Sequence, residues 1–181
     1  IGLFALICAK ACGAARLIAI GGPKGRLDLA KKAGADVVID IAEVSDLEER
    51  KQIVLDNTPK GEGADAVFEC AGFLPAIPEG LNYVRQSGTF VELGHFVDVG
   101  TFECNPNTML MRKNLRFEAV WASLPEHFIR GLPILERNEY PFAEMVSHVL
   151  PLDRVAEGFT ALAGSYRLDG KDVIKIGVKG N

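Results

Sequence analysis

Residues 16–39, RLIAIGGPKGRLDLAKKAGADVVI, decide the fold class of the chain. An apolar strand comes first, a Gly-Gly-Pro turn ends it, a helix follows and stops at a glycine, and a short buried strand closes the stretch. We expect these elements at residues 16–20, 21–23, 25–33 and 37–39, with Gly34 as the stop. Two short apolar strands joined by a helix indicate a parallel strand–helix–strand unit.

The same alternation continues on both sides of this stretch. A helix over residues 1–12 is followed by Gly13, and Ser45 and Glu48 have the spacing of a capping box, which predicts that a helix begins at Ser45. Further elements are expected as strands at residues 64–69 and 89–93 and a helix at 75–84. The sequence therefore predicts an α/β fold, a doubly wound parallel sheet with helices on both faces.

The rhythm changes after Gly94. We expect an extended stretch, a short helix, a strand and a longer helix, at residues 96–106, 108–113, 115–121 and 125–137. From His148 onward a different unit is expected, with a helix at 151–163 and a terminal strand at 173–178. The predicted division is an α/β domain at residues 1–147 and a segment at 148–181 that returns to a second domain.

Composition narrows the classes of partner. The chain has 181 residues, a formal net charge of -4 and no cluster of basic residues, which argues against nucleic acid and favours a small-molecule partner. No apolar run reaches the roughly 18 residues that cross a bilayer, so we expect no membrane partner and a cytoplasmic location. Cys8 and Cys12 lie one helical turn apart, a spacing that could hold a metal, but no third ligand has a matching spacing. The other cysteines and the three histidines are scattered, so we expect no metal ligand in this chain.

The start of the first helix is the expected pyrophosphate site. A dinucleotide fold binds that group at a helix N-terminus, where backbone N–H groups are unpaired. Ile1 and Gly2 would be the last two residues of a G-x-G-x-x-G turn, although one glycine beside a helix is a weak signal. Proteins that prefer NAD usually place an acid at the end of the second strand, where this chain has Gly21. With Lys24 and Arg26 close by, the sequence slightly favours NADP over NAD.

Four stretches, in this order, resemble the coenzyme domain and C-terminal segment of the zinc-containing medium-chain alcohol and polyol dehydrogenases. They are GLFALICAKACGAARLIAIGG (residues 2–22), KKAGAD (31–36), GADAVFECAG (63–72) and GTFVELGHF (88–96). The resemblance covers essentially the whole chain. It implies a Rossmann-type sheet lacking its first strand, followed by a segment of a GroES-like catalytic domain.

The resemblance also implies the cofactor-binding residues. These are Ile1, Gly2 and Lys171 at the pyrophosphate, Gly21, Gly22, Lys24 and Arg26 near the adenosine ribose, Ala71, Gly72 and Phe73 at adenine and ribose, Leu93, Gly94 and His95 beside nicotinamide, and Val120 and Ala122 at its carboxamide. His95 and Trp121 would line the substrate pocket. An imidazole titrates near neutrality, so His95 is also the one candidate here for a proton carrier.

The function implied by the resemblance is NAD(P)-dependent hydride transfer between nicotinamide and an alcohol, a polyol or its carbonyl. The zinc that polarises the alcohol would be bound by a preceding half of the protein, so we expect this fragment alone to be inactive. The resemblance further implies a homodimer or a dimer-based tetramer formed through residues 101–103 and 115–119. The alternatives are a zinc-free quinone reductase of the same superfamily and a dinucleotide-binding module without catalysis.

Overall fold

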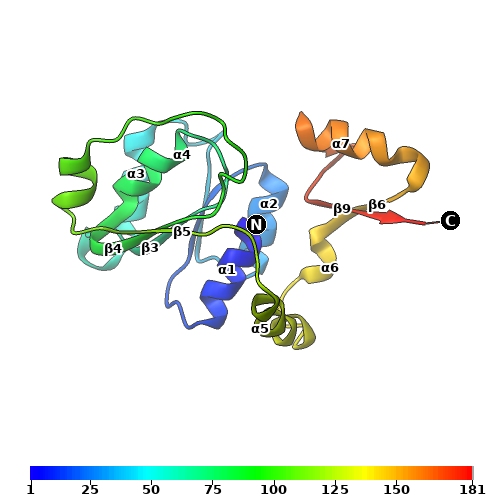
Figure 1. The fold of residues 1–181 in the computed structure, drawn as a ribbon, viewed down its shortest axis with the longest axis horizontal. Helices are drawn as coiled ribbons and strands as arrows, with labels where there is room; N and C mark the ends of the chain where they lie inside the picture. The colour runs from blue at the N-terminus through cyan, green and yellow to red at the C-terminus, as the bar shows by residue number, and fades with distance from the viewer. Residues whose placement is uncertain (181) are drawn as a thin grey trace.

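The computed structural model describes residues 1–180, and its first part alternates helices with short strands (Figure 1). Helix α1 begins at Gly2, one residue after the expected start. In chain order the elements are α1 (Gly2–Ala11), β1 (Ile18–Gly21), α2 (Lys24–Lys32), β2 (Val37–Asp40), α3 (Leu47–Asp56), the turn η1 (Pro59–Gly61), β3 (Ala64–Glu69), α4 (Ala76–Tyr83) and β4 (Val84–Glu92).

The remaining elements leave this alternation and lead into a separate small unit. They are the π-helical turn η2 (Pro106–Met111), β5 (Arg116–Ala119), α5 (Pro125–Glu136), α6 (Phe142–Met145), β6 (Val146–Pro151), the turn η3 (Leu152–Arg154), α7 (Val155–Ala163), β7 (Arg167–Leu168), β8 (Lys171–Asp172) and β9 (Lys175–Lys179).

The first part contains two parallel sheets. β1 pairs with β2, so that Gly21 lies opposite Asp40, and β3, β4 and β5 form the second sheet in that order. Within residues 1–180, β1 and β3 do not pair with each other. This is the arrangement expected of a doubly wound sheet without its first strand, because that strand lies between these two edges.

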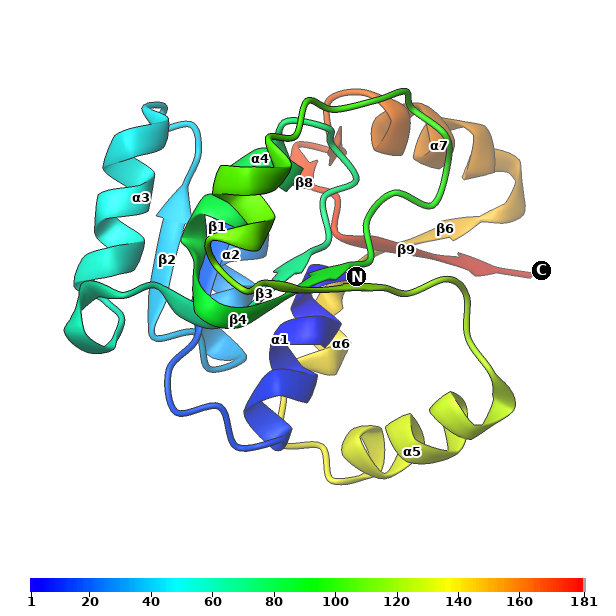
Figure 2. The same cartoon turned by 60° about the vertical axis from the view of Figure 1, so that its left-hand side comes forward.

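Helices pack on the strands in two groups. α1 contacts α2, which covers β1 and β2, while α3 contacts α4, which covers β3 and β4. Figure 2 shows α4 in front of the strands and α2 behind them. The core follows the same division, since Ile7 and Leu29 are buried between α1 and α2, and Leu81 and Phe90 between α4 and β4. Phe90 has no exposed surface. The predicted α/β class is confirmed.

The structure corrects several expected boundaries. Asp46, not Ser45, caps α3, because its carboxylate accepts the Glu49 backbone N–H at 2.8 Å. The helix therefore begins two residues after Ser45. β4 begins at Val84 instead of residue 89, and the short helix expected at 108–113 is the π-helical turn η2. Gly13 and Gly34 end their helices with positive φ, as expected.

The C-terminal segment forms its own small sheet. β6 and β9 pair in parallel, and β7 and β8 form an antiparallel pair that precedes β9. Sequence reasoning missed α6 and β6, and it placed the last strand slightly too early. Figure 1 shows this segment on the opposite side of the molecule from α3. Among residues 1–180, no helix has the length and apolar character to span a membrane.

Candidate functional site

The carboxyl ends of the parallel strands carry most of the predicted site residues. The Gly21–Gly22 turn follows β1, residues 71–73 follow β3, residues 93–95 follow β4, and residues 120–122 follow β5. The N-terminus of α1 reaches the same edge, because a Cβ atom built on Gly2 would lie 3.6 Å from the Cβ of Cys70. In open α/β sheets, ligands bind in the crevice outside the carboxyl ends of the strands.

The first turn of α1 is suited to an anion. The N–H groups of Gly2 and Leu3 have no helical partner, and the turn contains no acidic side chain. Gly2 adds no Cβ atom to the approach. A pyrophosphate fits this end of the helix in charge and in hydrogen bonding.

The turn between β1 and α2 is held by the C-terminal segment. Asp172 accepts the Gly25 backbone N–H at 3.1 Å, and Arg26 donates to the Val173 carbonyl at 3.3 Å. The Arg26 guanidinium also lies over the ring of Tyr166, 4.6 Å from its centroid. Lys24 forms an ion pair with Asp28, with 2.7 Å between the charged atoms, on the exposed face of α2. Both cations predicted to meet a 2′-phosphate therefore have protein partners.

The loops after β3 and β4 touch through two glycines. A Cβ atom on Gly72 would lie 2.5 Å from the Gly94 carbonyl oxygen, and a Cβ atom on Gly94 would lie 2.9 Å from the Gly72 Cα. Gly72 also has a φ of +65°, which side chains rarely adopt. The two loops predicted to hold adenine, ribose and nicotinamide therefore depend on glycine to reach their positions.

Two glutamates and a histidine lie beneath this contact. Glu69, the last residue of β3, accepts the N–H groups of Ala71 at 2.7 Å and Gly72 at 3.1 Å. Glu92, the last residue of β4, accepts the His95 backbone N–H at 3.1 Å and lies 3.0 Å from the His95 Nδ1. The same histidine Nδ1 is 3.4 Å from Glu69. These side chains fix the conformation of both loops.

The two carboxyl groups differ in proton affinity. Burial, together with the negative charge of Glu92, raises the pKa of Glu69. Burial also acts to raise the pKa of Glu92, but hydrogen bonds from His95 and from the backbone outweigh it and hold that pKa below its ordinary value. Like charges at close range disfavour joint ionisation. A proton taken up by the pair therefore resides on Glu69.

The same three side chains are the one acid–histidine group among residues 1–180 whose ligand atoms lie close enough, within 4.8 Å of one another, for a metal ion. The carboxylate of Glu69 and the Nδ1 of His95 are already hydrogen bonded within the protein. The group also lacks the cysteine or histidine majority typical of zinc sites in dehydrogenases. It does not fit a zinc centre, and we assign it to loop structure.

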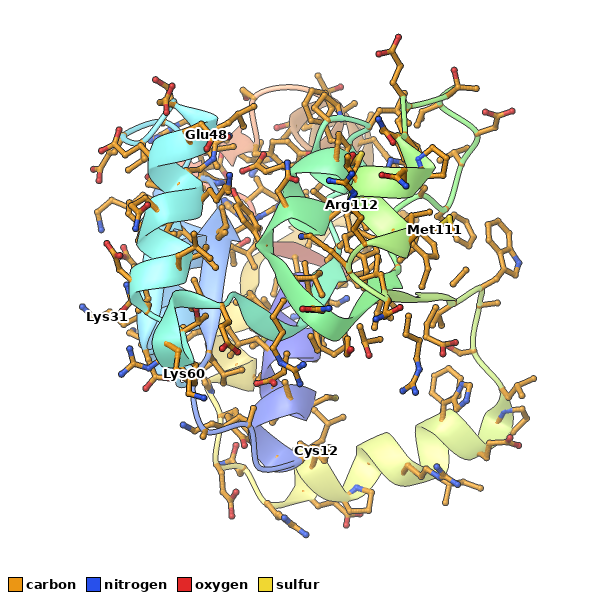
Figure 3. The ribbon with its side chains drawn as sticks, turned by 90° about the vertical axis from the view of Figure 1, so that its left-hand side faces the viewer. Cys12, Lys31, Glu48, Lys60, Met111 and Arg112 are labelled. Carbon is orange, nitrogen blue, oxygen red and sulfur yellow. The ribbon has the colours of Figure 1, made fainter. Side chains whose placement is uncertain are left out.

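The cysteines do not supply a zinc site either. Cys8 and Cys12 are free and exposed, one turn apart on α1, and Figure 3 shows Cys12 at the end of that helix. Burial raises the pKa of Cys70 to about 11, which disfavours the thiolate that a metal requires.

Aromatic side chains mark the end of β5. Trp121 stacks on Phe96 with 4.8 Å between the ring centroids and 9° between the planes, yet 70% of its surface is exposed. Val120 donates its backbone N–H to the Glu92 carbonyl at 3.0 Å, and Ala122 has a φ of +60°. The loop thus lies against the loop after β4 and presents an open apolar surface.

The sequence of this α/β part matches a known family. A family model described as zinc-binding dehydrogenase matches residues 1–137. The chain belongs to the zinc-binding dehydrogenase family. The resemblance of the sequence to medium-chain alcohol and polyol dehydrogenases is confirmed.

Curated members of the zinc-binding dehydrogenase family are similar along most of the chain. The 5-exo-hydroxycamphor dehydrogenase of Pseudomonas putida is 33% identical over 87% of this chain and 43% of its own length. The erythritol/L-threitol dehydrogenase of Mycolicibacterium smegmatis is 31% identical over 97% of this chain and 45% of its own length. The chain therefore spans less than half the length of these relatives.

Solved structures agree with the fold. An alcohol dehydrogenase from Thermotoga maritima superposes with a TM-score of 0.88 and 28% identity, covering 99% of this chain and 47% of its own. A 2R,3R-butanediol dehydrogenase from Bacillus subtilis, at 23% identity, covers 99% of this chain and 48% of its own with a TM-score of 0.75, which shows the shared fold alone.

Sequence reasoning missed three acidic residues of this edge. Glu69 and Glu92 each end a strand, and that shared position was a usable signal. Asp172 gave no such signal, because its partner Gly25 is 147 residues away.

Proposed function

We propose that this chain supplies the cofactor-binding part of an NAD(P)-dependent dehydrogenase that transfers hydride between nicotinamide and an alcohol, a polyol or the corresponding carbonyl. The observation that carries this proposal is the set of loops at one sheet edge, in a chain of the zinc-binding dehydrogenase family. The similar camphor-alcohol and tetritol enzymes support a small alcohol or carbonyl as the substrate.

Each loop has a task in this proposal. Ile1 and Gly2 would hold the pyrophosphate with free N–H groups of α1, with Lys171 as an added cation. Gly21 and Gly22 would lie against the adenosine ribose, with Ala71, Gly72 and Phe73 at adenine. These positions repeat the expectations from the sequence, and the shared edge of the sheet supports them.

The nicotinamide would lie at the loops after β4 and β5. Leu93, Gly94 and His95 would flank the ring, Val120 and Ala122 would bind its carboxamide, and Trp121 would line the substrate pocket. The bound nicotinamide supplies the hydride acceptor. His95 is held by Glu92 and Glu69, which supports a positioning role at the pocket more than a proton-carrier role.

For the form of the cofactor we infer NAD. The expectation of NADP rested on Gly21, Lys24 and Arg26, but Lys24 is paired with Asp28 and Arg26 with Tyr166 and Val173. A 2′-phosphate would have to compete with the Asp28 carboxylate for Lys24, and would have to draw Arg26 from its contacts with the Tyr166 ring and the Val173 carbonyl.

Zinc would be bound elsewhere in the complete protein, because the side chains of residues 1–180 do not fit a zinc centre. We propose residues 1–147 as the dinucleotide-binding domain and 148–181 as part of the catalytic domain. The separate β6–β9 sheet supports a division close to this point, and β6 begins two residues earlier, at Val146. All four residues of β5, an edge strand, are exposed, which supports a homodimer or dimer-based tetramer formed there.

The test uses the full-length protein with NAD or NADP and a panel of polyols and secondary alcohols. We expect alcohol-dependent formation of reduced nicotinamide, followed by its absorbance, and loss of this activity on zinc chelation. Nucleotide binding without turnover on any alcohol would favour the binding-module alternative. Quinone reduction that survives chelation would favour the zinc-free reductase.

A further inference from the structure

Asp172 lies at the turn where the adenosine ribose is expected. It belongs to β8 in the C-terminal segment, and only 22% of its side chain is exposed. Its Oδ2 accepts the Gly25 N–H at 3.1 Å, so the carboxylate lies on the first turn of α2. A Cβ atom on Gly25 would come within 2.8 Å of that oxygen, so glycine is needed for this close approach.

A second carboxylate flanks the same turn. Asp40, at the end of β2, lies opposite Gly21 in the sheet register, and a Cβ atom on Gly22 would lie 3.9 Å from its Oδ1. The turn that lacks an acid of its own is therefore bordered by acids from β2 and from β8.

The nearby cations are held by other groups. Asp28 balances the charge of Lys24, and the Arg26 guanidinium is held by the Val173 carbonyl and the Tyr166 ring instead of pairing with a carboxylate. Arg167 contacts the Asp172 Oδ1 at 3.3 Å, but its side chain is 60% exposed and it also donates to the Gly170 carbonyl at 2.7 Å. Water screens the charge of the exposed Arg167 more than that of the less exposed Asp172. The negative charge of Asp172 therefore still acts on the turn.

We propose that Asp172 is a cofactor-specificity residue: supplied by the C-terminal segment, it assumes the role of the acid that is absent at Gly21 and disfavours the 2′-phosphate of NADP. This inference rests on the proposed function. The carboxylate occupies the N–H group of Gly25 that a phosphate would use, and it places a negative charge beside the group that distinguishes the two cofactors. NAD carries a hydroxyl there and escapes the repulsion.

The experiment is a calorimetric titration of the full-length protein with NAD and NADP, repeated on Asp172→Asn. Asparagine keeps an oxygen that accepts the Gly25 N–H and removes the charge. We expect the wild type to bind NAD more tightly, and the variant to narrow the NAD/NADP affinity ratio about tenfold, mainly by binding NADP more tightly. Asp153→Asn, an exposed acid in η3, is the matched control for net charge and should leave the ratio unchanged.

The outcomes separate this inference from the proposed function. Tighter binding of NADP by the wild type would overturn it, and so would an Asp172→Asn ratio equal to that of the control. Asp172→Glu, which retains the charge, should keep the preference for NAD and serves if the asparagine variant folds poorly. Failure of the wild type to bind either nucleotide would instead reject the proposed function.

Discussion

Replacing Gly94 with alanine should separate the loops that follow β3 and β4. The new methyl group would overlap the Glu69 carboxylate and the Gly72 backbone nitrogen, and would lie 2.9 Å from the Gly72 Cα. Moving the backbone of two packed loops costs about 1–3 kcal/mol. Moving the carboxylate instead would leave the partly buried N–H groups of Ala71 and Gly72 without their acceptor, at up to about 1–3 kcal/mol for each.

By either route the free energy of unfolding should fall by about 1–3 kcal/mol, and nucleotide affinity should weaken. The assay is urea denaturation of the full-length protein, paired with a nucleotide titration. Gly131→Ala is the matched control, since nothing lies within 4 Å of its added Cβ and a helix-interior alanine stabilises by up to about 1 kcal/mol. A Gly94→Ala variant as stable as the wild type, with unchanged affinity, would refute the reasoning.

Three further substitutions test other parts of the account. The raised pKa of Glu69 lowers stability as the pH rises above its ordinary value of 4.5, so Glu69→Gln should flatten that decline in unfolding experiments from pH 5 to 7; an unchanged slope would contradict the assignment. Arg50 is buried and lies 2.6 Å from the carboxylate of Glu79. Glu79→Ala removes this ionic partner, so the free energy of unfolding measured in urea should fall by about 3–5 kcal/mol. Asp46→Ala should lower the free energy of unfolding by about 1 kcal/mol, because α3 loses its cap, whereas Ser45→Ala should change it little. A larger loss for Ser45→Ala than for Asp46→Ala would support the capping box predicted at Ser45.

Local patterns identified most elements of residues 1–92. The apolar runs of β1, β2 and β3 each adjoin a glycine turn, and such a pattern depends only on neighbouring residues. The α3 cap shows the limit of such reasoning. Ser45 and Asp46 both belong to residue types that cap helices, and the backbone path, which the sequence does not show, decides between them.

The sequence predicted only those site residues whose position follows from their neighbours in the chain. Glycines at strand ends pointed to the loops after β3 and β4, but the meeting of Glu69 with His95 depends on two strands lying side by side. The contact of Asp172 with Gly25 joins distant parts of the chain, and no spacing rule foresees it. The expectation of NADP rested on neighbouring residues and did not include this contact, and the cofactor titration decides between it and our proposal of NAD.

The central claim is that one sheet edge binds a nicotinamide dinucleotide. Hydrogen–deuterium exchange of the full-length protein with and without saturating NAD tests it most directly. The account predicts slower exchange in the first turn of α1 and in the loops at residues 21–26, 70–73 and 93–95, with no change in α3. Binding of NAD without protection of any of these loops, or protection confined to α3, would contradict it.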